Sequence, residues 1–295
     1  MYKKVVCFLS CILILFISIL SIRMVQNIRT KKDVLEANKI FNEQNEIYIN
    51  RDEELGSIEY KSNTMSINIL PIKKTNPNIN MWEVNIKLSS GIQIKSAFAD
   101  DKFNLRNREK TSDIAKRHNA ILAINGAAAG FNKSSYVIRD SIIYRDTRLD
   151  CAPLVIQKDG DFRIYDDDLS GKELVERGAM HTYDFGPDLI RGGEIVDYGN
   201  TWYKEDLAPR TVIGQKGPLE YVILVVDGRS KESAGMSLYD TAVELKNRGC
   251  YWGYNLDGGG STTLYFNGEV LNTPSDWNGE RKITDILYFR LVTKI

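Results

Sequence analysis

Side chains able to do chemistry are concentrated in one stretch near the C-terminal end, Tyr254–Thr263. It contains the glycines 258–260, preceded by Asn255 and Asp257 and followed by Ser261. Consecutive glycines let the backbone adopt positive φ angles and approach a ligand closely. An ordinary turn needs only one glycine and a turn-forming Asn or Asp. We therefore expect a binding loop here, in which a carboxylate lies beside backbone N–H groups that can hold an anion.

Other segments match the motifs of a known family together with this loop. They are Ala123-Ile124-Asn125-Gly126, Pro209-Arg210-Thr211-Val212-Ile213-Gly214, Val226-Asp227-Gly228-Arg229, Gly235-Met236-Ser237 and Asn272-Thr273-Pro274-Ser275. In this order the chain resembles the phosphodiester glycosidase family, and the glycine loop and Pro-Arg-Thr are the most specific motifs. It departs from the family at Ala127-Ala128-Ala129, where another glycine and aromatic residues are usual. One wall of the pocket is therefore expected to differ.

The resemblance implies hydrolysis of a sugar 1-phosphodiester, with Asp257 and Asp227 as catalytic residues. Glycosyl transfer to water uses one carboxylate for proton transfer and another to stabilise an oxocarbenium-like transition state. The phosphate leaving group is already a stabilised anion, so neutralising its charge is more important than protonating it. A guanidinium suits that task because it is permanently charged and binds two oxygens at once.

The residues expected to bind the substrate all lie within these motifs: Asn125, Gly126, Arg210, Thr211, Arg229, Asn255, Gly258, Gly259 and Ser261. Some also have a purely structural interpretation. Asp227-Gly228 could be only a turn, Arg210 an ion-pair partner, and Asn125 a cap for loop amides.

The function predicted is that of a membrane-anchored glycosidase acting on phosphodiesters of cell-envelope or exopolysaccharide glycans, with no required cofactor. One alternative is a metal-assisted phosphodiesterase, because an oxygen-rich site of Asp227, Asp257 and Asn255 could hold Ca²⁺ or Mg²⁺. Another is a module that binds a glycan or phosphopolymer without cleaving it. Metal ligands are left unassigned.

Composition narrows the remaining function classes. The chain has 295 residues and a formal charge of +0, which argues against nucleic-acid binding, since that needs a cationic surface. Only 2 histidines and 4 cysteines are present, which leaves little material for a zinc-type site. Of the cysteines after the N-terminal segment, Cys151 and Cys250 could form a disulfide or remain free thiols.

The N-terminal segment has the character of a membrane anchor. Residues 5–22 are apolar and long enough to span a bilayer. No small-residue cleavage site follows, so a transmembrane signal-anchor over 1–22 is favoured over a cleaved signal peptide. A charged juxtamembrane stalk is expected over 23–56 and the glycosidase-like domain over 57–295. We expect one membrane pass, with the C-terminal domain outside the cytoplasm.

Strand patterns dominate after the stalk, and the fold class predicted is α+β, a single domain of mixed β-sheets with a few helices. Residues 221–257 read as strand, helix and strand, with Ser237 capping the helix. If the two strands are parallel, Asp227 and Asp257 emerge at one edge of a sheet. Asn125 follows a third apolar strand and is expected in the same pocket.

Overall fold

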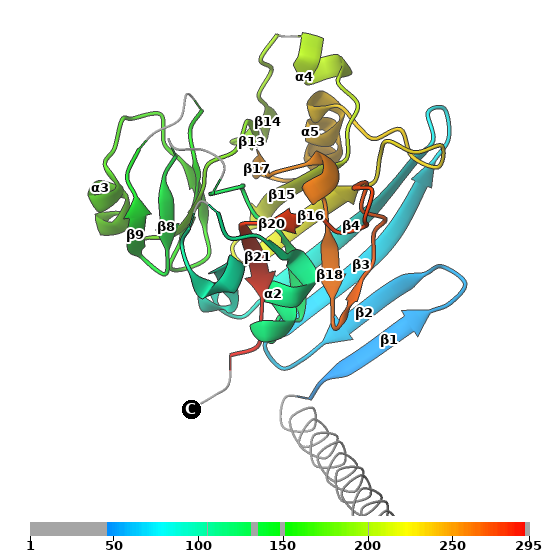
Figure 1. Ribbon diagram of the computed structural model, residues 1–295, viewed down its shortest axis with the longest axis horizontal. Coiled ribbons are helices and arrows are strands. Elements are labelled where there is room, and N and C mark those ends of the chain that lie inside the picture. Colours follow the sequence, from blue (N-terminus) through cyan, green and yellow to red (C-terminus); the bar gives the residue numbers. More distant parts are fainter. Residues whose placement is uncertain (1–45, 105, 131–134, 148–150, 200, 293–295) are drawn as a thin grey trace, which may run out of the picture. The chain divides into compact units, whose positions relative to one another are not determined.

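The computed structural model describes residues 46–104, 106–130, 135–147, 151–199 and 201–292 (Figure 1). The predicted anchor over 1–22 and most of the predicted stalk lie outside these residues. No helix among the described residues is long and apolar enough to cross a membrane. The chain divides into two units, Met1–Tyr48 and Ile49–Ile295, and the second contains the sheets.

A nine-stranded sheet forms the largest layer of this unit. Its order is β1 (Tyr48–Asp52), β2 (Ser57–Lys61), β3 (Met65–Lys74), β4 (Ile79–Leu88), β16 (Glu220–Val226), β15 (Arg210–Gly217), β17 (Trp252–Asn255), β13 (Asp188–Arg191) and β14 (Glu194–Ile195). Successive side chains of a strand point to opposite faces. Val222 and Leu224 of β16 therefore pack in the cluster with helix α5 (Leu238–Asn247). Tyr221, on the other face, contacts the ring of Phe289 in a second sheet.

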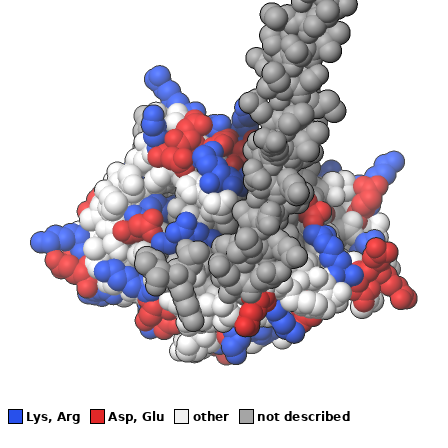
Figure 2. All heavy atoms as spheres, turned by 90° about the horizontal axis from the view of Figure 1, so that it is seen from below, with Lys and Arg blue, Asp and Glu red and all other residues white. Residues whose placement is uncertain are grey.

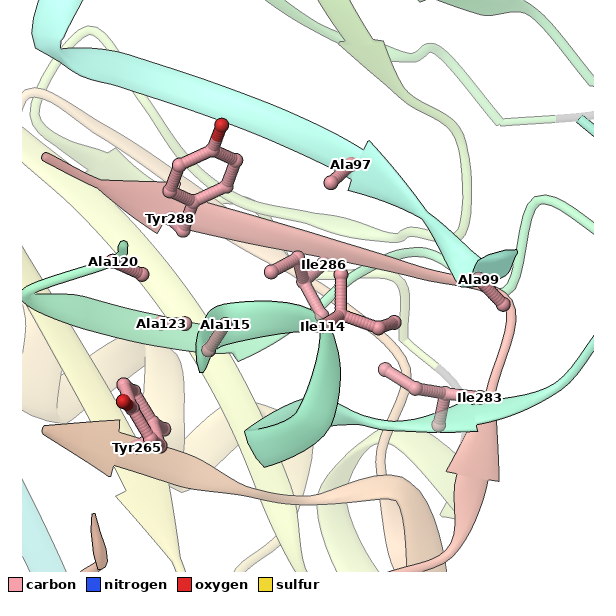
Figure 3. Packing of buried hydrophobic residues seen from close by; sticks show 10 residues of the cluster. All are labelled: Ala97, Ala99, Ile114, Ala115, Ala120, Ala123, Tyr265, Ile283, Ile286 and Tyr288. Atoms are coloured by element: carbon pink, nitrogen blue, oxygen red, sulfur yellow. The ribbon is translucent and has the colours of Figure 1, made fainter. Parts of the chain in front are cut away.

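The second sheet has five strands and packs against the first. Its order is β19 (Glu269–Val270), β18 (Leu264–Phe266), β7 (Leu122–Asn125), β21 (Asp285–Phe289) and β5 (Ile94–Phe98). Helix α2 (Thr111–Arg117) covers its outer face, where Ile114 and Ala115 pack on Ala123 and Ile286 (Figure 3). The layers therefore run helix, sheet, sheet, helix.

Smaller elements complete the domain. They are the three-stranded sheet β11 (Phe162–Ile164), β10 (Leu154–Gln157) and β12 (Ala179–Tyr183), the pairs β20 (Lys282–Ile283) with β6 (Glu109–Lys110) and β8 (Val137–Arg139) with β9 (Ile142–Arg145), the helices α3 (Gly171–Glu176) and α4 (Thr201–Glu205), and the 3₁₀ turns η1 (Gly91–Gln93), η2 (Ala99–Asp101) and η3 (Gly259–Ser261).

The predicted α+β class is confirmed, since the described residues are mostly strands with a few helices. The expectation of mixed sheets is not met, because every strand pair with a described register is antiparallel. β16 and β17 do run in the same direction, because each pairs antiparallel with β15 between them. The shared edge expected for Asp227 and Asp257 therefore exists, although their strands are not neighbours.

The predicted cap of the helix is confirmed. Ser237 caps α5, and its hydroxyl accepts a hydrogen bond from Asp240 N at 3.0 Å.

The domain begins before the expected boundary at residue 57, because β1 already belongs to the large sheet.

The two cysteines of the domain do not form a disulfide. Cys151 and Cys250 are free thiols held in different places. Cys151 lies against Gly186, and Cys250 lies beneath Gly214 of β15. Burial raises the pKa of Cys151 to about 11, so this thiol is a weak nucleophile at neutral pH.

Candidate active site

The polar ends of strands from both sheets meet at the start of β15. Gly259 N donates to Pro209 O at 2.9 Å from the β17 side. On the β16 side Gly228 packs so closely that a Cβ there would lie 2.9 Å from Pro209 N. Pro209 therefore lies between the Asp227 loop and the glycine loop, whose η3 turn is orange in Figure 1.

Asn125 joins the two sheets instead of facing open solvent. It is fully buried at the end of β7, and its Nδ2 donates to Asp257 O at 2.6 Å. Its Oδ1 accepts from Thr211 Oγ1 at 2.8 Å and from Thr263 N at 3.2 Å. Asn125 and Thr211 were both expected to bind substrate. In the structure their side chains instead form hydrogen bonds that position the glycine loop.

Asp257 begins the glycine loop with a half-buried carboxylate. Burial raises its pKa, while the Ser261 hydroxyl, Gly258 N and Arg281 act in the opposite direction. Its Oδ1 accepts from Gly258 N at 2.9 Å. A carboxyl group with a raised pKa, placed against a glycine-rich loop, suits proton transfer near neutral pH.

Asp227 is the second buried carboxylate, and it is held by the segment that follows β19. Its Oδ1 accepts from Asn272 Nδ2 at 3.1 Å and from Thr273 N at 3.0 Å. Asn272 Nδ2 also donates to Thr262 O at 3.1 Å, so one side chain links Asp227 to the glycine loop. Burial raises the pKa of Asp227, whereas the bonds from Asn272 and Thr273 lower it.

The guanidinium of Arg210 binds backbone carbonyl oxygens of neighbouring loops. Its Nε donates to Met236 O at 3.0 Å and its Nη2 to Asp206 O at 2.6 Å. It also pairs with the Asp206 carboxylate at 3.2 Å. Burial lowers the pKa of Arg210, and the Asp206 charge opposes that shift. The structural interpretation of Arg210 thus has direct support.

Two other guanidinium groups lie on the glycine loop itself. A Cβ at Gly259, whose φ is +60°, would lie 3.1 Å from Arg229 Nη2. Arg229 is exposed and makes no hydrogen bond or ion pair with another described residue. At Gly260 a Cβ would lie 2.5 Å from Arg281 Cζ and 2.7 Å from its Nε. Both glycines are therefore needed for this close approach.

The same region contains buried polar atoms that lack partners. Among the described residues, these include Asn255 Oδ1, Thr262 Oγ1 and Ser275 Oγ. A buried polar atom without a partner is costly, and such atoms are often found where a ligand or water binds. Asn255 Nδ2 donates to Gly186 O at 2.7 Å, which leaves Asn255 Oδ1 as the atom of this side chain without a partner. The substrate-binding roles of Asn255 and Ser261 stay predictions.

A buried ion pair supports the wall of alanines next to the site. Asp285 Oδ2 pairs with Arg139 Nη2 at 2.9 Å, and both side chains are almost fully buried. Asp285 Oδ1 also accepts from Ala129 N at 3.1 Å. At Gly126 a Cβ would lie 2.6 Å from Asp285 Cγ, so Gly126 serves backbone packing here.

Sequence reasoning missed Arg281, Asn272 and Asp285 as contributors. The motif Asn272–Ser275 marked the right segment, but nothing in it indicated a bond to Asp227. Arg281 lies beyond that motif, and only the folded chain brings it to Gly260.

No group of three or more His, Cys, Asp or Glu residues in the described ranges is arranged to hold a metal ion. On the face shown in Figure 2, charges of both signs are interspersed.

One buried and one half-buried carboxylate, Asp227 and Asp257, thus flank a glycine loop that two arginines contact. The family model of phosphodiester glycosidases matches residues 118–290. The chain therefore belongs to the phosphodiester glycosidase family, as its motifs indicated.

Individual relatives agree with this assignment. The chain is 32% identical over 198 residues to the SPbeta prophage-derived uncharacterized protein YomE of Bacillus subtilis, covering 63% of this chain and 30% of that protein. It is 32% identical over 87 residues to the bovine N-acetylglucosamine-1-phosphodiester α-N-acetylglucosaminidase, covering 28% of this chain and 16% of that enzyme. The chain thus spans under a third of the length of these curated relatives.

A solved structure shows the same fold. The catalytic domain of the zebrafish N-acetylglucosamine-1-phosphodiester α-N-acetylglucosaminidase, auto-inhibited by its pro-peptide, superposes with a TM-score of 0.67 at 22% identity. The match covers 79% of this chain and 85% of that one. A hypothetical protein from Synechocystis matches with a TM-score of 0.61 at 13% identity, covering 83% and 68% of the two chains.

Proposed function

We propose that this protein hydrolyses sugar 1-phosphodiesters by breaking the bond between C1 of the sugar and the phosphate oxygen. The products are a free sugar and a phosphomonoester. The observation that carries the proposal is the placement of Asp257 and Asp227 on either side of Pro209, next to guanidinium groups on Gly259 and Gly260. Family membership and the activity named for the bovine and zebrafish relatives support it.

The phosphate is bound at the glycine loop in this proposal. Arg229 and Arg281 lie on that loop, and Arg229 has no competing partner among the described residues. Charge-assisted hydrogen bonds from guanidinium to phosphate strengthen as negative charge builds on the leaving group. The buried hydroxyl of Thr262, which has no partner among the described residues, provides an additional donor.

The carboxylates act on the sugar side of the scissile bond. As the C1–O bond breaks, its electron pair goes to the phosphate oxygen and positive charge develops at C1 and the ring oxygen. Asp257 takes a proton from the attacking water or stabilises this charge, with Asp227 as its companion. Burial raises the pKa of both groups, which makes each carboxylate a stronger proton acceptor than a solvent-exposed one.

The location and natural substrate are part of the same proposal. An apolar segment over residues 5–22 supports an anchor in the cell membrane with the domain outside the cytoplasm. An enzyme so placed would meet phosphodiester-linked glycans of the cell envelope or exopolysaccharide. If the anchor is used, the protein fractionates with membranes, and protease added to intact cells digests its C-terminal domain.

Hydrolysis in water labelled with ¹⁸O identifies the bond that breaks. Label in the free sugar means cleavage at C1 and supports a glycosidase. Label in the phosphate means attack at phosphorus and supports a phosphodiesterase instead. Tight binding of a panel of sugar 1-phosphodiesters without any product would indicate a binding module.

A further inference from the structure

The loop of residues 228–235, here called the Arg229 loop, closes on itself and brings Arg229 to the glycine loop. Its two ends touch, because a Cβ at Gly228 would lie 2.9 Å from the Cα of Gly235. The backbone of Arg229 has a φ of +60°, a left-handed conformation that is costly for a residue with a Cβ. Such a conformation persists only where the surrounding structure holds it in place.

One buried hydroxyl fastens the Arg229 loop to the large sheet. Ser233 is fully buried, whereas residues 229–232 are exposed. Its Oγ donates to Asp227 O at 2.6 Å and accepts from Asn80 N at 3.0 Å. Asp227 directly follows β16 and Asn80 lies at the start of β4, so the hydroxyl binds the backbone at the ends of two neighbouring strands.

The backbone of Ser233 in turn holds the residue next to Arg229. Ser230 N donates to Ser233 O at 3.0 Å, and Ser233 N donates to Ser230 Oγ at 3.1 Å. Ser230 directly follows Arg229, and at the glycine loop a Cβ on Gly259 would lie 3.1 Å from Arg229 Nη2. A continuous series of bonds therefore runs from the large sheet to the guanidinium on the glycine loop.

We propose that Ser233 is a positioning residue that holds the Arg229 guanidinium at the glycine loop ready for phosphate. The inference rests on the proposed function, in which Arg229 binds the phosphate of the substrate. Arg229 makes no hydrogen bond or ion pair with another described residue, so its direction is set by its backbone. A fixed backbone lowers the entropy lost when the side chain binds, which makes the binding of phosphate tighter.

Asp227 has supports that do not depend on the Ser233 hydroxyl. Its N donates to Asn80 O at 2.9 Å, and its carboxylate accepts from Asn272 Nδ2 at 3.1 Å. These bonds remain when the hydroxyl is removed. Ser233→Ala should therefore act on the position of Arg229 and leave the Asp227 carboxylate in place.

Trypsin measures the order of the Arg229 loop without any substrate. It cleaves after Arg229 and Lys231 only when the loop leaves its folded position. Cleavage at these two bonds, quantified by mass spectrometry, should be at least about tenfold faster in Ser233→Ala than in the parent, because a buried backbone donor loses its partner. Equal cleavage rates in the two proteins would overturn the proposal.

A second variant breaks the next bond of the series at an exposed position. Ser230 Oγ accepts from Ser233 N at 3.1 Å and from Glu232 N at 3.2 Å. Because Ser230 is exposed, Ser230→Ala should fold even if Ser233→Ala does not. It should also speed cleavage of the loop, and parental rates in this variant would contradict the series of bonds.

The matched control is Thr182→Val. Thr182 in β12 is also fully buried, and its Oγ1 donates to Tyr136 O at 3.2 Å and accepts from Ile138 N at 3.0 Å. The variant removes an equivalent pair of hydrogen bonds in a different sheet. It should lower the melting temperature but leave both the loop cleavage and kcat/KM at parental values.

A double-mutant cycle with Arg229 separates positioning from a general loss of structure. Arg229→Ala should lower kcat/KM for a sugar 1-phosphodiester by about tenfold or more, the value of one charge-assisted hydrogen bond. Ser233→Ala should lower it about threefold or more in the parent, but less than about twofold when residue 229 is already alanine. Equal losses in both backgrounds would show that Ser233 does not act through Arg229.

Binding of inorganic phosphate separates failure of this inference from failure of the proposed function. In calorimetric titrations the parent should bind phosphate more tightly than Arg229→Ala, with Ser233→Ala between the two. If this order is found but no sugar phosphodiester is hydrolysed, the proposed function fails and the positioning role stands. Equal affinity of the parent and Ser233→Ala, or no phosphate binding by the parent, refutes the positioning role.

Discussion

The Arg281 guanidinium lies directly on the Cα of Gly260, where a Cβ would come within 2.5 Å of Cζ. The same arginine is fixed through Nε by Asp276 at 2.8 Å. Gly260 is therefore glycine because a cation occupies the place of its side chain. The contact joins the specific motif of the family to a residue well outside it.

Gly260→Ala should act through Arg281. The clash is with the end of a flexible side chain, so the protein can fold by moving the guanidinium aside. We expect a parental melting temperature but a loss in kcat/KM of roughly tenfold to a thousandfold, as for Arg281→Ala. The double variant should lose little more than either single one, because both remove one interaction. Additive losses in this cycle would show that Gly260 and Arg281 act separately.

Gly258→Ala provides the structural contrast. There a Cβ would lie 2.7 Å from Pro209 O, which is backbone and cannot rotate away. We expect a clear loss of stability in thermal unfolding, unlike Gly260→Ala. Equal melting temperatures for the two variants would contradict this account of the loop.

Asp257→Asn should separate catalysis from folding. Asparagine keeps an acceptor for Gly258 N but carries no charge and takes no proton. We expect kcat to fall at least about a hundredfold, the lower range for loss of an acid–base group. Asp227→Asn is the companion, and its Asn272 contact is expected to survive. Near-parental turnover of Asp257→Asn on a cleavable ester would remove this loop as the catalytic centre.

The stability of Asp257→Asn should depend on pH in a defined direction. Burial raises the pKa of Asp257 above 3.8, so the folded parent binds this proton more tightly than the unfolded chain does. The contribution of Asp257 to the free energy of unfolding of the parent is therefore complete below pH 3.8. It declines as the pH rises through the pKa that Asp257 has in the folded protein. Asparagine does not titrate. Denaturant unfolding should show the variant gaining on the parent from pH 4 to neutral pH, with the difference shrinking below about pH 4.

Arginine-to-lysine exchanges should distinguish Arg210 from Arg229. Arg210 binds the buried oxygens of Met236 and Asp206, which a lysine cannot serve together. Arg210→Lys should lower the free energy of unfolding by about 1–3 kcal/mol and also reduce kcat/KM. Arg229→Lys should reduce kcat/KM while changing stability by less than about 0.5 kcal/mol. If Arg210→Lys alters activity but not stability, Arg210 is a direct phosphate ligand, as its motif first suggested.

The sequence revealed most of what local pattern controls. The buried strand before Asp227, the helix beginning after Ser237 and the polar strand ends at Asn125 and Asp257 all follow from periodicity and capping chemistry. Strand neighbours were harder, because β15 enters between β16 and β17 from an earlier part of the chain. Pairing between distant segments depends on the packing of whole sheets, which a local pattern does not report.

The site shows the same division between local and distant information. The predicted site residues stay a prediction, and two of them, Asn125 and Thr211, hydrogen-bond to each other at 2.8 Å. Sequence cannot show which of two polar groups is satisfied inside the protein. Arg281 was missed because its place at Gly260 depends on the fold of a separate loop.

The buried pair Arg139–Asp285 yields the last prediction, which concerns the alanine wall of the site. Asp285 binds Arg139 at 2.9 Å and the Ala129 amide at 3.1 Å with almost no solvent access. Removing one partner leaves a buried charge unpaired, so Arg139→Ala should lower the free energy of unfolding by about 3–5 kcal/mol. The control is Lys172→Ala, which breaks the exposed pair with Glu176 and should cost at most about 0.5 kcal/mol. Urea unfolding measures both. A loss in Arg139→Ala no larger than the control would mean that the Arg139–Asp285 pair contributes no more stability than an exposed ion pair, and the alanine wall would then depend on hydrogen bonds alone.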